Sequence, residues 1–163
     1  MQGVLVRISF VGLLLSACSS ATTAPAQIQA LVAFNSSLDT TLLGTAGLEV
    51  LGVFTAPPVA LVIGTSDALD RVGQHPQVAY VARFPDLSDS LEVFVRFRDR
   101  PTTADTVTDV DRALIPSLGG YIRYVYDIIP DVAAIIPLSA LQSLQASPLI
   151  AKVAPAGPPG HIH

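Results

Sequence analysis

The sequence is poor in the residues on which most metal and thiol chemistry depends. Its 163 residues include no tryptophan, one cysteine, one methionine and three histidines. A single cysteine cannot form a disulfide within the chain, and so few histidines and thiols leave little for a metal centre or a catalytic thiol. The composition therefore disfavours most classes of enzyme. We expect a non-enzymatic protein with no metal, no cofactor and no small-molecule substrate.

Charged residues are also scarce, at 13% of the chain, and Lys and Arg (9) are fewer than Asp and Glu (13). A net charge of −4 argues against a nucleic-acid partner, which needs a basic surface. The 13 prolines and 11 glycines are spread along the chain and exclude a coiled coil or a bundle of long helices. The length allows one ordinary domain or two small ones.

The first residues have the pattern of a secretory signal. Arg7 precedes an apolar run over residues 8–15, which is too short to span a bilayer, and small residues follow in Leu15-Ser16-Ala17-Cys18. This ending resembles the lipobox of bacterial lipoproteins. The resemblance implies that residues 1–17 are removed as a signal peptide and that Cys18 becomes lipidated, which anchors the protein to a membrane. The alternative is an ordinary cleaved signal followed by an incidental cysteine.

The resemblance also implies a location in the bacterial cell envelope. Ser19, rather than Asp, follows the cysteine, which in lipoproteins of the Gram-negative type favours the outer membrane. Residues 18–29 contain the lipidated cysteine and a stretch without periodicity or large apolar side chains, so we interpret them as a flexible tether. The mature protein is thus expected to be extracytoplasmic and membrane-anchored.

The rest of the chain reads as two copies of one unit, residues 30–84 and 90–155, joined by a linker at 85–89 and followed by a Pro/Gly-rich tail at 156–163. Residues 57–63 can be aligned with 130–136 at an offset of 73, which places Pro57 on Pro130. After one deleted residue, positions 68–79 align with 140–151 at an offset of 72. In both copies this pattern predicts a turn, a strand, a short helix, a proline turn and a final strand.

Each copy is predicted to begin with a strand, at 30–34 and 91–98. In the second copy Thr103-Ala104-Asp105 can cap a helix with apolar residues at 107, 110, 114 and 118, whereas residues 36–47 leave room for only about two helical turns in the first. We expect Val110 and Tyr124 to lie in the core. The order β-α-β-β-α-β predicts the α+β class, with two tandem ferredoxin-like units, the first trimmed, and antiparallel sheets with helices on one face.

The second copy, residues 90–155, resembles the subtilisin-propeptide-like inhibitor family. The residues that carry the resemblance are the strand Val93–Phe97, the turn Leu118-Gly119-Gly120, the segment Tyr124–Pro137 and the ending Leu138–Val153. Members of this family are propeptides that chaperone and block subtilisin-like serine proteases, or free-standing inhibitors of them. The resemblance therefore implies a subtilisin-like serine protease as the partner.

The resemblance also implies a binding mode. The open sheet face would pack on surface helices of the protease, with Asp127 and Asp131 facing helix N-termini. The C-terminal tail would lie extended in the substrate cleft and present His161, Ile162 and His163, although the three prolines from residue 155 onward lack the N–H group that strand pairing uses. In the first copy the aligned positions are Phe54 and Pro58, so this copy is interpreted as a scaffold.

Other interpretations remain open. The chain could be a structural or adaptor envelope lipoprotein that uses the same fold without inhibiting a protease, or the remnant of a protease gene. Three smaller features have alternatives as well: a metal pair formed by His161 and His163, a stacking platform formed by the tyrosines at 121, 124 and 126, and a basic ladder of arginines at 96, 98 and 100 that could meet acidic lipid or glycan. For each of these features the sequence favours the plain structural interpretation.

Overall fold

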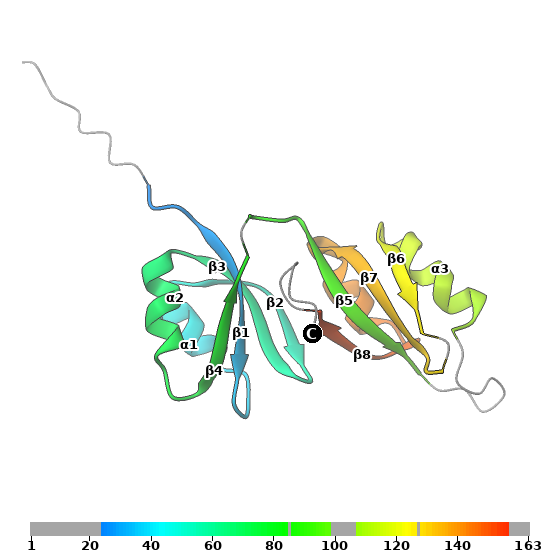
Figure 1. The fold of residues 1–163 in the computed structure, drawn as a ribbon, viewed down its shortest axis with the longest axis horizontal. Helices are drawn as coiled ribbons and strands as arrows, with labels where there is room; N and C mark the ends of the chain where they lie inside the picture. The colour runs from blue at the N-terminus through cyan, green and yellow to red at the C-terminus, as the bar shows by residue number, and fades with distance from the viewer. Residues whose placement is uncertain (1–23, 85, 99–106, 127, 157–163) are drawn as a thin grey trace, which may run out of the picture.

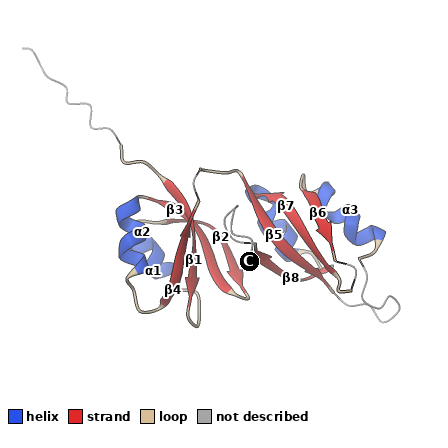
Figure 2. Cartoon of the chain, viewed as in Figure 1, coloured by secondary structure: helices blue, strands red, loops and turns tan. Residues whose placement is uncertain are grey.

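The computed structural model describes residues 24–84, 86–98, 107–126 and 128–156. These residues form two four-stranded antiparallel sheets and four α-helices, so the protein is of the α+β class (Figures 1 and 2). The arrangement is compatible with two ferredoxin-like units. Among the helices of these residues, none has the length and apolar character needed to cross a bilayer.

The first unit has the strand order β2-β3-β1-β4 in its sheet. Its central strand β1 is antiparallel to both neighbours, so that Val32 lies between Ala60 of β3 and Val81 of β4. The six-residue α1 confirms the short helix that the sequence predicts here. In chain order the elements are β1 (Ile28–Phe34), α1 (Thr40–Thr45), β2 (Glu49–Thr55), β3 (Pro58–Gly64), α2 (Ser66–Gly73) and β4 (Val78–Arg83).

The second unit repeats this plan with the strand order β6-β7-β5-β8. Val95 lies between Val132 and Val153, as Val32 does between its two neighbours in the first sheet. A 3-10 turn, η1, leads directly into the second helix of the unit. The elements are β5 (Ser90–Phe97), α3 (Asp109–Ser117), β6 (Tyr121–Val125), β7 (Asp131–Pro137), η1 (Leu138–Ala140), α4 (Leu141–Ala146) and β8 (Ile150–Pro155).

From the second strand of each unit onward, equivalent positions are 72 residues apart, and the offset of 73 expected for residues 57–63 is wrong. Gly47 and Gly119 both have positive φ, 83° and 79°, at the turn before the second strand of their units, a conformation that glycine adopts without strain. The strand pairings agree, because Leu61 faces Gly52 as Ala133 faces Tyr124. Pro57 and Pro130 occupy different positions of their hairpins, so a match between them shifts the strand by one residue, which reverses every side chain of that strand.

Helix α3 begins later than the sequence predicts. Its N-cap is Thr108 rather than the segment 103–105, which lies outside the described residues. Thr108 and Asp111 form a capping box, in which the Asp111 carboxylate accepts from the Thr108 N–H (3.0 Å) and hydroxyl (2.7 Å). The expectation that Val110 is in the core is wrong, because α3 buries the face that carries Asp111 and Ile115, which leaves 60% of the Val110 surface exposed.

Replacing Asp111 with alanine should lower the free energy of unfolding by about 0.5–2 kcal/mol, the range for losing an N-cap interaction. Asp111 is only 3% exposed, so its loss leaves the Thr108 N–H without this acceptor. Chemical unfolding followed by circular dichroism measures the change. Asp109→Ala, on the same turn but exposed, is the control and should have a smaller effect. Equal effects of the two substitutions would show that the capping box does not contribute.

The first sheet is covered on both faces. Ala30, Val32 and Phe34 pack beneath α1 and α2, whereas Leu31 on the opposite face belongs to the same apolar cluster as Leu144 of the second unit. The other first-unit members of this shared cluster are Ala33, Phe54, Val59, Leu61 and Phe84. The sheet of the first unit therefore lies between its own helices and the second unit.

Specific contacts join β2 to the α4 region of the second unit. A Cβ atom on Gly52 would lie 2.6 Å from Leu141 Cδ2, so the leucine occupies space that only a glycine leaves free. Gln145 Nε2 donates to the Val53 carbonyl (2.8 Å), and at the linker Gln29 and Ser88 exchange two hydrogen bonds of 3.2 Å. Figure 1 shows β2 on the side of the first sheet that faces the second unit.

Candidate functional site

The sheet of the second unit has one face that no helix of the described residues covers. Along β5, Val93 and Val95 are fully buried against α3 and α4, whereas the alternating residues Phe94 and Arg96 are exposed. We call this surface the open face. It consists of Glu92, Phe94, Arg96, Tyr121, Arg123, Tyr124, Tyr126, Asp131, Ala133, Ile135, Lys152 and Ala154.

Three aromatic rings cluster at the centre of the open face. Phe94 and Tyr124 both pair with Ala133, from opposite sides, so two large side chains flank a small one. The Tyr124 and Tyr126 rings meet edge to face with centroids 4.9 Å apart, and the Phe94 and Tyr126 centroids are 6.4 Å apart. Phe94 is 40% and Tyr124 56% exposed. Exposed aromatic residues grouped in this way are typical of protein-binding surfaces.

Two ion pairs cross the strands around the aromatic cluster. The Arg96 Nε and NH2 groups donate to the two oxygens of Asp131 at 2.7 and 2.8 Å, a bidentate geometry that fixes both side chains. Arg123 donates to Glu92 at 2.8 Å. Most of the charge on the open face is thus compensated within the sheet.

Of the site residues predicted from the sequence, the structure places Asp131 on the open face, as the first residue of β7. Its carboxylate is already held by Arg96 and is 15% exposed, so it would meet a partner as part of an ion pair. Asp127, Cys18, His161, Ile162 and His163 lie outside the described residues. Of the arginine ladder, Arg100 lies outside them too.

The expectation that Tyr124 belongs to the core is wrong, and a β-bulge explains the error. Tyr121 pairs with Ile135 and Ile122 with Ala134, but Tyr124 pairs with Ala133, so Arg123 is an extra residue in β6. Strict alternation would put Tyr124 on the same face as Ile122, whereas the bulge turns it to the open face with Tyr121. The exposure of Phe94 is not predictable for a simpler reason: in the sequence it is one more apolar residue of a strand.

In the first unit the face equivalent to the open face is mostly apolar and buried, although Tyr80, at the position of Lys152, is exposed. Leu31, Ala33 and Phe54 stand where the second unit has Phe94, Arg96 and Tyr126, and all three are at most 6% exposed. Val59, rather than the expected Pro58, is the counterpart of Asp131. The same sheet face therefore serves two purposes: it holds the two units together in the first copy and is exposed to solvent in the second.

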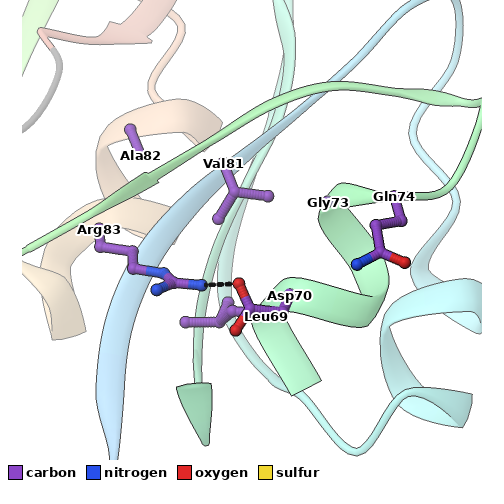
Figure 3. Close-up of a pocket in the computed structure, with 7 residues that line it drawn as sticks. All are labelled: Leu69, Asp70, Gly73, Gln74, Val81, Ala82 and Arg83. Carbon is purple, nitrogen blue, oxygen red and sulfur yellow. Dashed lines mark hydrogen bonds and ion pairs between the residues drawn. The ribbon is translucent and has the colours of Figure 1, made fainter. Parts of the chain in front are cut away.

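A separate depression of about 690 Å³ lies on the first unit between α2 and β4. Figure 3 shows its lining, in which Arg83 reaches across to Asp70. Both charged side chains are exposed, and such a pair contributes little to stability. The other lining residues are Leu69, Gly73, Gln74, Val81 and Ala82.

Within the described part of the chain, no group of three His, Cys, Asp or Glu residues could hold a metal ion. His75 lies in the turn after α2, where its Nδ1 accepts from the Gln77 N–H at 3.4 Å. The near-perpendicular Tyr124 and Tyr126 rings are not coplanar, so they do not form a flat stacking platform.

No protein-family model matches the chain, and no curated protein shows a significant match to it.

Proposed function

We propose that this chain is a lipid-anchored, extracytoplasmic binding protein made of two ferredoxin-like units. In this proposal the second unit docks its open face on a subtilisin-like serine protease and inhibits it, and the first unit is a scaffold. The observation that carries the proposal is the contrast between the two equivalent faces. The face of the first unit is apolar and buried by the second unit, whereas that of the second unit exposes Phe94 and Tyr124.

The end of the described chain fits the proposed mode of inhibition. β8 is an edge strand of the second sheet, and the Ala156 N–H continues its pairing by donating to the Glu92 carbonyl at 3.0 Å. The tail therefore starts from a fixed point at the edge of the open face. We propose that His161, Ile162 and His163 lie in the substrate cleft and bind like a product, while Asp127 and Asp131 face helix N-termini of the protease.

The anchoring part of the proposal rests on the sequence. Cys18 would carry the lipid, and residues 18–27 would tether the two units to the membrane of a bacterial cell envelope. The tether expected over residues 18–29 is two residues too long, because Ile28 and Gln29 belong to β1. The partner is therefore expected to be another envelope or secreted protein. The scarcity of basic residues and the proposed extracytoplasmic location both argue against a nucleic-acid partner.

The proposal predicts that the open face is required for inhibition. The test uses residues 18–163 with Cys18→Ser, here called the soluble chain, against a panel of subtilisin-like proteases and a small peptide substrate. The double variant Phe94→Ala/Tyr124→Ala should weaken inhibition at least about 30-fold, because exposed aromatics at an interface centre are typical hot spots. Tyr80→Ala is the matched control, since Tyr80 is 55% exposed on the first unit, and it should leave inhibition unchanged.

A second variant separates the tail from the face. A soluble chain that ends at Pro155 should still bind the protease through the open face but lose most of its inhibition. Failure of the soluble chain to inhibit any protease of the panel, with its folding verified by circular dichroism, would contradict the proposal. Binding to a protease without inhibition would favour the adaptor interpretation.

A further inference from the structure

Beside the aromatic cluster the open face has a small hollow of about 110 Å³. The hollow is lined by Phe94, Arg96, Asp131, Lys152 and Ala154. It arises because large and small side chains alternate across the sheet, from Tyr124 through Ala133 and Phe94 to Ala154. The Phe94 ring and the small Ala154 side chain give it an apolar part, and the charged residues lie in the next row.

Two basic residues and one acidic residue line the hollow. Arg96 and Asp131 form the bidentate pair, which leaves Lys152 as an additional positive charge. Lys152 pairs in register with Arg96, is exposed, and forms no ion pair within the described residues. This excess of positive charge occurs in a chain whose net charge is −4. A ligand that complements the hollow is therefore expected to carry a negative charge, as a carboxylate does.

In the first unit, the cross-strand row equivalent to Tyr124, Ala133, Phe94 and Ala154 shows how a side chain from a packed neighbour fills the space beside a small residue. There Gly52 replaces Tyr124, and Leu141 of the second unit seats its Cδ2 in the space beside that glycine. A side chain from the helical layer of one unit thus fills a gap in the sheet face of another. The hollow at Ala154 is the corresponding kind of gap on the open face, with a charged wall in place of an apolar one.

We propose that the hollow receives the side chain of an aspartate or glutamate of the protein that docks on the open face, with the Lys152 ammonium as its counter-charge. The identity of the docked protein as a protease rests on the proposed function, but the chemistry of the hollow does not. Docking would cover Phe94 and exclude water from the hollow, which strengthens the attraction between the two charges. Lys152 is thus a specificity-determining residue for acidic positions on the partner.

The first measurement uses a protease that the soluble chain inhibits. Lys152→Gln should weaken inhibition about tenfold, because it removes the attraction between the ammonium group and the partner's carboxylate. Lys152→Glu should weaken inhibition about a hundredfold, because it replaces that attraction with a repulsion between two carboxylates. The effect of Lys152→Gln should shrink at high salt, where the charge is screened in the parent as well. Arg112→Gln is the matched control, since Arg112 is exposed on α3 away from the open face, and it should have no effect.

The second measurement needs no protease. The soluble chain is titrated with N-acetyl-glutamate methylamide and followed by amide chemical shifts. We expect shifts at Phe94, Lys152 and Ala154 that Lys152→Gln abolishes and that the N-acetyl-glutamine analogue does not produce. If the soluble chain inhibits nothing but these shifts appear, the proposed function fails and the carboxylate site stands.

Three results would overturn the carboxylate site. The first is equal inhibition by the parent and Lys152→Glu. The second is a glutamate titration without shifts on the open face. The third is that Lys152→Gln abolishes binding to vesicles of anionic lipid while it leaves the glutamate titration unchanged, which would assign Lys152 to a membrane surface instead.

Discussion

Replacing Phe54 with alanine is expected to lower the free energy of unfolding by about 3–5 kcal/mol, the range for truncating a buried aromatic residue. Phe54 is fully buried in the apolar cluster that the two units share. Its loss leaves a cavity at the junction, where neither unit alone can close it. Urea or guanidinium unfolding followed by circular dichroism measures the change.

Phe94 provides the matched control for Phe54. It lies on the equivalent sheet face of the second unit but is 40% exposed, and Phe94→Ala should cost about 1 kcal/mol or less. If the two substitutions destabilise the protein equally, the two faces do not differ in the way described. If Phe54→Ala is harmless, the first sheet does not rely on the second unit for its cover.

A similarly large effect is expected for Ile115→Ala, which should lower the free energy of unfolding by about 2–5 kcal/mol. Ile115 is fully buried on α3, and a Cβ atom on Gly120 would lie 3.2 Å from its Cγ2 atom, so the side chain fills the junction of helix and strand. The same unfolding measurement applies.

Val110 lies on the same helix and is 60% exposed, so Val110→Ala should change the stability by no more than about 0.5 kcal/mol. This pair of substitutions tests the register of α3 directly. A larger loss from Val110→Ala than from Ile115→Ala would mean that the helix presents the face expected from the sequence rather than the one described here.

The strands were the most predictable part of the fold. Val93, Val95 and Phe97 alternate with more exposed residues along β5, and this period of two is visible in the sequence because one face of the sheet is buried. The start of α3 was less predictable. A threonine with an acidic residue shortly after it occurs both at 103–105 and at Thr108. The structure has the N-cap at Thr108, where the capping box with Asp111 and the burial of Ile115 both favour this start.

The candidate site was less predictable than the fold, for two physical reasons. The bulge at Arg123 reverses the face of Tyr124, and no residue of β6 marks that bulge in the sequence. The burial of Leu31 and Phe54 depends on a contact between the two units, which no local pattern encodes. Asp131 could be predicted only through the family resemblance, which implies acids between the second and third strands, whereas its partner Arg96 is visible in the sequence only as part of an arginine ladder.

The contact between the two units has a consequence for assembly. One repeat places its sheet face on the helical layer of the next, and a head-to-tail contact between similar bodies can in principle continue from molecule to molecule into a filament. Two features of this chain oppose such a continuation. The α4 surface of each chain is already occupied by its own first unit, and charged Arg96, Asp131 and Lys152 stand where the first unit has Ala33, Val59 and Tyr80. The charged residues of the second copy thus make its sheet face a poor match for the helical layer that covers the first sheet.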